Sequence, residues 1–195
     1  MSGDRQVKVL FDEQTIAERT EALAREIAAV QPKDLLVVAI LKGSFMFAAD
    51  LLRALHRVGL EPQVEFFHLS SYLSGTVSSG TVKILRDIES SVRDRDVLLV
   101  DDILESGRTL AFAKDLLAAR GARRVLVCTM LEKPGKRVVE IGADFVGFVC
   151  PDVFVVGYGM DVAHSYRELP FIGRVITAQD SSEVEAAIPE TATRV

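Results

Sequence analysis

The sequence predicts an α/β fold in which a mainly parallel, twisted sheet is flanked by helices. Several short runs are almost entirely apolar, as expected for strands that are buried on both faces. Segments with apolar residues at helical spacing alternate with these runs, which is the order of strand–helix–strand units. The chain of 195 residues can form one domain with a sizeable core, and no linker or internal repeat divides it. We therefore expect a single domain over 1–195.

The first part of the chain contains two predicted helices and two predicted strands. Apolar residues recur at helical spacing over about 12–30, and Pro32 ends that helix. The run LLVVAIL (35–41) predicts a buried strand, and FMFAADLLRALHRVG predicts a helix that ends at Gly59. The run VEFFHL (64–69) predicts the next strand.

The rest of the chain continues this alternation after a Ser- and Gly-rich stretch, 70–80, which predicts a long flexible loop. TVKIL and VLLVDD predict strands, and GRTLAFAKDLLAARG predicts a helix that stops at Gly121. Further strands are expected at RVLVCTML, DFVGFV and RVITA, and the tail, about 181–195, reads as a short helical turn with a loose end. Irregular, glycine-rich sequence around Gly157 predicts a small hood lobe over the end of the sheet.

Composition excludes some classes of function. No apolar run reaches the roughly 20 residues that span a bilayer, and the first residues lack the apolar centre of a signal peptide, so we expect a cytoplasmic protein without a membrane partner. The net charge of −5 argues against a nucleic-acid partner. Cys128 and Cys150 lie in apolar runs, which favours buried hydrophobic residues over a disulfide or metal pair.

Chemically distinctive residues follow three of the predicted strands. Lys42 and Gly43 follow the first, Asp101 and Asp102 end a later one, and Lys133 follows the next. In open α/β sheets, ligands bind in the crevice at the carboxyl ends of the strands. We therefore expect these residues to share one site.

The turn from Glu105 to Thr109 has the features of a phosphate site. It opens a helix, so it offers unpaired N–H groups, hydroxyl donors and the positive end of the helix dipole. It has neither the Walker spacing nor the dinucleotide fingerprint. Asp101 and Asp102 would repel a nearby phosphate unless they bind vicinal hydroxyls or a divalent cation. Together these features describe a ribose 5-phosphate site; the alternative is a helix start that merely follows a strand, with solvated acids.

Several segments resemble one enzyme family. LLVDDILESGRTL resembles the phosphoribosyl pyrophosphate motif of the type I phosphoribosyltransferases. AILKGSFMFAADLL, SSY at 70–72, LEKP and DVFVVGYGMDVAHSYREL are similar, in order, to segments of the hypoxanthine-guanine phosphoribosyltransferases, so the resemblance covers about 35–176. It implies a purine salvage enzyme that needs Mg²⁺, transfers the phosphoribosyl group of phosphoribosyl pyrophosphate to N9 of hypoxanthine or guanine, and yields IMP or GMP with pyrophosphate. It also implies a homodimer or homotetramer.

The resemblance also implies a role for individual residues. Pyrophosphate would be bound by Lys42, Gly43 and Arg167, with a cis peptide between Leu41 and Lys42. The ribose 5-phosphate would be bound by Asp101, Asp102, Glu105, Ser106, Gly107, Arg108 and Thr109. Mg²⁺ would be bound by Asp101, Asp102 and Asp161. The purine would be bound by Ile103, Lys133, Phe154 and Val155, with Lys133 at the 6-oxygen and Phe154 stacked on the ring. The flexible hood loop would begin at Ser71 and Tyr72.

Glu105 departs from the family pattern, which normally has Asp at this position. We expect Glu105 to act as the general base that accepts the purine N7 proton. The added methylene moves the carboxylate by roughly 1 Å, so the alternative is that Glu105 has lost this role.

Other interpretations stay open from the residues alone. The chain could be a regulator that senses phosphoribosyl pyrophosphate and contacts nucleic acid, or a transferase for xanthine or a pyrimidine. Phe154 could be an ordinary core aromatic, and Arg167 could pair with Asp161 or Glu168 on the surface.

Overall fold

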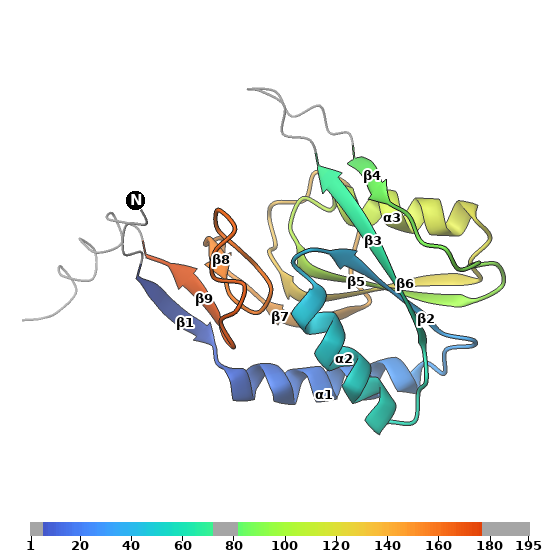
Figure 1. Ribbon diagram of the computed structural model, residues 1–195, viewed down its shortest axis with the longest axis horizontal. Coiled ribbons are helices and arrows are strands. Elements are labelled where there is room, and N and C mark those ends of the chain that lie inside the picture. The colour runs from blue at the N-terminus through green and yellow to red at the C-terminus, as the bar shows by residue number, and fades with distance from the viewer. Residues whose placement is uncertain (1–5, 72–81, 177–195) are drawn as a thin grey trace, which may run out of the picture.

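A six-stranded sheet forms the centre of the protein, whose computed structural model describes residues 6–71 and 82–176 (Figure 1). Neighbouring strands are parallel except for the edge pair β3 and β4, so the predicted mainly parallel α/β sheet is confirmed. In spatial order, the strands are β4 (Val82–Arg86), β3 (Gln63–Ser71), β2 (Leu36–Leu41), β5 (Asp96–Leu104), β6 (Arg124–Glu132) and β7 (Phe145–Val149).

Three helices cover the two faces of this sheet, namely α1 (Glu13–Ala29), α2 (Phe45–Arg57) and α3 (Arg108–Ala119). The side chains of β2 alternate between two buried clusters because successive residues of a strand point to opposite faces. Val37 and Ala39 pack with residues of α1 and α2, whereas Leu36 and Val38 pack with residues of α3. Burial on both faces explains why this strand reads as a continuous apolar run.

A second, antiparallel sheet forms the hood beside the main one (Figure 1). It consists of β1 (Val7–Phe11), β9 (Ile172–Val175) and β8 (Val155–Val156), in that spatial order. The expected strand RVITA overlaps β9 at Arg174 and Val175, whereas its last two residues lie outside the described ranges. The strand β1 was not predicted. The hood therefore joins the beginning of the described chain to its end.

The predicted helices agree closely with the observed ones. Asp12 caps α1 by accepting a 2.8 Å hydrogen bond from the Thr15 amide. Most of the predicted flexible loop, including Tyr72, falls on 72–81, and the predicted tail falls on 177–195; both lie outside the described residues. Within the described ranges, no helix has the length and apolar character needed to cross a membrane.

Adjacent phenylalanines of β3 provide a test of which face is core. Phe67 is fully buried against the α3 side, whereas Phe66 points to the opposite face and is 41% exposed. We expect Phe67→Ala to lower the free energy of unfolding by about 3–5 kcal/mol, through lost burial and the cavity it leaves, and Phe66→Ala to cost about 1 kcal/mol. Urea unfolding of both variants measures this, and equal losses would contradict the packing described.

Candidate active site

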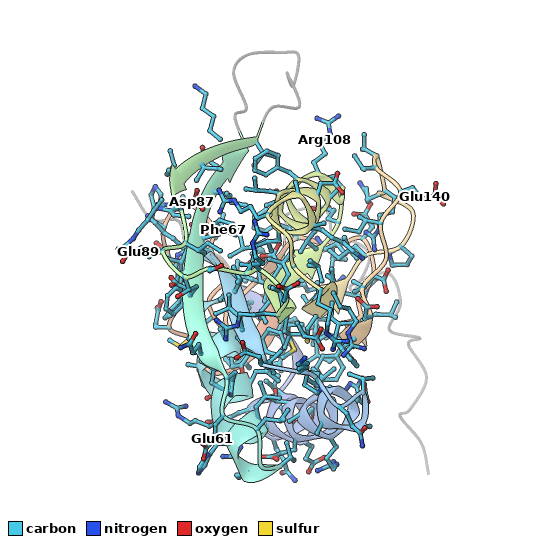
Figure 2. All side chains as sticks on the ribbon, turned by 90° about the vertical axis from the view of Figure 1, so that its right-hand side faces the viewer. Glu61, Phe67, Asp87, Glu89, Arg108 and Glu140 are labelled. Atoms are coloured by element: carbon cyan, nitrogen blue, oxygen red, sulfur yellow. The ribbon has the colours of Figure 1, made fainter. Side chains whose placement is uncertain are left out.

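The carboxyl ends of β2 and β5 form one wall of a cavity of about 280 Å³. The two strands are parallel neighbours, so the residues that follow β2 lie beside the end of β5. In Figure 2, Arg108 at the start of α3 and Glu140 lie at the same end of the molecule, opposite Glu61. Of the sequence-predicted residues, the cavity brings together Lys42, Gly43, Asp101, Asp102, Ile103, Glu105, Ser106, Gly107 and Thr109.

Asp101 and Asp102 are adjacent carboxylates at a buried strand end. The Asp102 amide donates to Asp101 Oδ1 at 3.0 Å, and the Ile103 amide donates to Asp102 Oδ1 at 2.9 Å. Burial and the neighbouring carboxylate raise the pKa of Asp101 well above its ordinary value, and burial raises the pKa of Asp102. The pair therefore favours a proton, a cation or hydroxyl donors at this point.

The donor set at this position fits Mg²⁺ that is shared with a substrate. Among the described residues, no group of three or more Asp, Glu, His or Cys side chains forms a complete metal cage. Mg²⁺ commonly binds through one or two carboxylates and completes its shell with water and substrate oxygens. Two adjacent carboxylates, one buried and one partly buried, that favour a positive partner meet that requirement.

Gly107 shapes the loop that follows the acid pair. Its φ of +80° places it in the left-handed region, and a Cβ there would lie 2.6 Å from Ile141 Cγ2. It is also the N-cap residue of α3 and has no side chain to cap the helix. The first amides of α3 consequently lack a capping side chain from this position, which suits them to an anion.

The segment after β2 is packed tightly between β5 and the hood. A Cβ on Gly43 would lie 1.7 Å from Asp102 Oδ2, and a Cβ on Gly159 would lie 2.2 Å from the Gly43 carbonyl oxygen. The peptide bond between Leu41 and Lys42 is cis, as the resemblance implied. The main chain at Gly43 therefore lies so close to Asp102 that a side chain there would collide with its carboxylate.

Lys133 and Phe154 lie outside the lining of this cavity. Lys133 is buried, and its Nζ lies 3.7 Å from Oε1 of the half-exposed Glu105, so the two predicted base-contacting groups are neighbours. Phe154 is 57% exposed, so its interpretation as a core aromatic is wrong. Val155 is buried and pairs with Arg174 of β9.

Asp161 and Arg167 of the hood pair with each other, which was one of the alternatives from sequence. Arg167 Nη2 lies 2.5 Å from Asp161 Oδ1, and Arg167 Nη1 donates to the Gly159 carbonyl at 2.5 Å. The Arg167 charge also lowers the pKa of Asp102, although burial outweighs it. The hood thus directs a cation toward the acid pair.

The side chain of Arg108 extends outward at the start of α3 (Figure 2).

Two residues that contribute to the site were not singled out from sequence. Gly159 packs on Gly43, and Arg137 donates hydrogen bonds to the carbonyls of Leu104 and Glu105. Both act on main-chain atoms, which no side-chain pattern reveals. The glycine-rich character of the hood segment was the one available signal for Gly159.

Comparison with known proteins gives consistent matches. Residues 6–163 match the family described as phosphoribosyl transferase domain. The chain is 43% identical to the hypoxanthine phosphoribosyltransferase of Escherichia coli K12, over 87% of this chain and 96% of that one. It is 40% identical to a Staphylococcus aureus hypoxanthine phosphoribosyltransferase crystal structure, with a TM-score of 0.81 and coverage of 87% and 91%.

A further relative is longer than this chain. The bifunctional protein TilS/HprT of Listeria monocytogenes is 48% identical over 167 residues, which is 85% of this chain. The chain spans 25% of the length of that relative.

The raised pKa of Asp101 predicts a pH-dependent stability. Because the folded state holds the Asp101 proton more tightly than the unfolded chain, this contribution is complete below the ordinary Asp pKa and is lost as pH rises through the folded-state pKa. We expect Asp101→Asn to unfold about 2 °C or more above the wild type at pH 7 in the absence of divalent cations, with a smaller difference at pH 4.

Thermal unfolding between pH 4 and pH 8 measures this, with Asp115→Asn on the exposed face of α3 as the matched control. The expectation would be contradicted if the difference in unfolding temperature between Asp101→Asn and the wild type did not change with pH. It would also be contradicted if Asp101→Asn were less stable than the wild type at pH 7.

Proposed function

Because the chain belongs to the phosphoribosyl transferase domain family and has the type I phosphoribosyltransferase fold, we propose that this enzyme transfers the 5-phosphoribosyl group of phosphoribosyl pyrophosphate to N9 of hypoxanthine or guanine, with Mg²⁺. The products would be IMP or GMP and pyrophosphate. The observation that carries the proposal is one cavity in which an acid pair, a helix start with glycine at its N-cap and the Lys42–Gly43 segment meet.

Ribose 5-phosphate fits the geometry of the β5–α3 connection. The amides and hydroxyls from Ser106 to Thr109 would bind the phosphate, supported by the dipole of α3. Asp101 and Asp102 lie one turn before them and would accept hydrogen bonds from the ribose hydroxyls. The buried pair would then have the hydrogen-bond donors that its raised pKa values favour.

The leaving group carries a high negative charge, which this chain would neutralise from two sides. Lys42 and the Gly43 amide would bind pyrophosphate from β2, and Arg167 would bind it from the hood. When bound by Asp101, Asp102 and Asp161, Mg²⁺ would supply further charge neutralisation at the pyrophosphate oxygens. Arg167 is paired with Asp161, so the residue proposed to bind pyrophosphate and the hood carboxylate proposed to bind Mg²⁺ are neighbours.

The purine would lie between Phe154 and the end of β5, beside Ile103 and the main chain of Val155. Lys133 would donate to the 6-oxygen, and Glu105 would accept the N7 proton so that N9 becomes a better nucleophile. The 3.7 Å separation of Lys133 Nζ and Glu105 Oε1 supports adjacent contacts on one edge of the ring. A lysine recognises any 6-oxo purine, so xanthine is a further candidate base.

A base panel tests the proposed reaction. We expect the protein to form nucleotide from phosphoribosyl pyrophosphate with hypoxanthine or guanine, and to lose this activity when EDTA removes divalent cations. Adenine and pyrimidines, which do not present the purine 6-oxygen, should react far more slowly. Absence of turnover with every 6-oxo purine would rule out the proposal.

The role of Glu105 is tested separately with Glu105→Gln and Glu105→Asp. General-base catalysis typically contributes 10²–10⁴-fold, so we expect Glu105→Gln to lower kcat by about 100-fold while leaving the affinity for ribose 5-phosphate nearly unchanged. Glu105→Asp keeps the carboxylate and should retain far more activity. Near wild-type turnover by Glu105→Gln would show that the proton is accepted elsewhere.

A further inference from the structure

We propose that Arg137 is a positioning residue, which orients the peptide groups of the phosphate-binding loop and fixes that loop to the segment that carries Lys133. The inference deepens the proposed function and rests on it for the identity of the phosphate ligand. Arg137 lies outside the lining of the cavity, and the proposal concerns its action through the backbone of residues 104–107.

Three consecutive carbonyl groups of this loop are held by one neighbouring segment. Arg137 Nη1 donates to the Leu104 oxygen at 2.8 Å and to the Glu105 oxygen at 2.6 Å. The amides of Val138 and Val139 donate to the Ser106 oxygen at 3.0 and 3.3 Å. Every peptide plane between Leu104 and Gly107 therefore has its carbonyl side bound to the segment 137–139.

This arrangement determines where the amides of the loop point. In a trans peptide, the C=O of one residue and the N–H of the next point in opposite directions across a rigid plane. With the oxygens of Leu104, Glu105 and Ser106 held on the side of Arg137, the N–H groups of Glu105, Ser106 and Gly107 are directed away from it. Glu105, Ser106 and Gly107 line the cavity that would receive the 5-phosphate.

The guanidinium of Arg137 is itself fixed at its remaining donors. Its Nη2 lies 2.5 Å from Glu132 Oε1, and its Nε donates to the Ile141 carbonyl at 3.3 Å. The Arg137 side chain is 22% exposed and that of Glu132 is 28% exposed, so solvent competes only partly for these bonds. A planar guanidinium can serve several acceptors at fixed angles, which a lysine ammonium cannot reproduce.

The same interaction connects the phosphate loop to the end of β6. The Leu104 oxygen also accepts a 3.0 Å hydrogen bond from the Lys133 amide, and Glu132 directly precedes Lys133. Displacement of Arg137 would thus move the phosphate-binding amides relative to the group proposed to read the purine. Small misplacements of this kind can cost about 100-fold in rate.

Calorimetric titration with ribose 5-phosphate, which does not require turnover, tests the proposal on wild type, Arg137→Ala and Arg137→Lys. The control is Arg120→Ala, which removes a partly buried arginine that makes two hydrogen bonds to Asp87 at the other end of α3. We expect the affinity for ribose 5-phosphate to fall about 10-fold or more in Arg137→Ala, and less in Arg137→Lys, with no more than a twofold change in Arg120→Ala. Addition of guanidinium ions should partly restore binding by Arg137→Ala.

Two results would overturn the inference: an Arg137→Ala affinity within twofold of wild type, or an equal loss of affinity in Arg120→Ala. If Arg137→Ala does not fold, Arg137→Lys takes its place in the test. An affinity of Arg137→Lys for ribose 5-phosphate within twofold of wild type would then overturn the inference. Turnover of hypoxanthine, guanine and xanthine by the wild type is measured alongside. A wild type whose affinity for ribose 5-phosphate depends on Arg137, but which turns over none of these 6-oxo purines, would refute the proposed function and leave the inference standing.

Discussion

The burial of two adjacent carboxylates at the end of a strand is the constraint on which the site depends. Asp101 and Asp102 lie where burial raises the pKa of both side chains. Neutral residues at these two positions would make the folded protein more stable, because burying a charged group costs free energy. The surroundings instead bring the positive charge of Arg167 toward the pair from the hood, and the Gly43 backbone, which follows β2, packs closely against Asp102. The pair is therefore best understood as a site prepared for hydroxyls and a cation.

The fold places this pair next to the proposed phosphate site by chain connectivity alone. β5 ends, a short loop follows, and α3 begins at Arg108, so the acid pair and the helix start with glycine at its N-cap belong to one continuous segment. A ligand that combines a diol with a phosphate can satisfy both at once. The segment after β6 then braces the loop through its carbonyl oxygens, so the geometry of the phosphate site is held by hydrogen bonds on the side away from the ligand.

The sequence predicted the main sheet and the cavity lining well because both depend on local patterns. Continuous apolar runs mark β2, β5 and β6, and polar residues at their ends mark the site. The hood was harder to predict, because β1 pairs with β9, which lies more than 150 residues further along the chain. Arg137 was missed for a related reason: its acceptors in the loop 104–105 are main-chain oxygens, and an arginine in a connecting segment carries no sequence signal of that role. The roles of Lys133 and Phe154 came from family resemblance, since periodicity cannot distinguish a ligand contact from a surface residue.

The most direct test of this account is a crystal structure of the protein with IMP and Mg²⁺. We expect the 5-phosphate to lie against the amides between Ser106 and Thr109, and the ribose hydroxyls to contact Asp101 and Asp102. The purine 6-oxygen should lie within hydrogen-bonding distance of Lys133 Nζ. A nucleotide whose phosphate is bound elsewhere, with the acid pair in contact with neither its hydroxyls nor Mg²⁺, would contradict it.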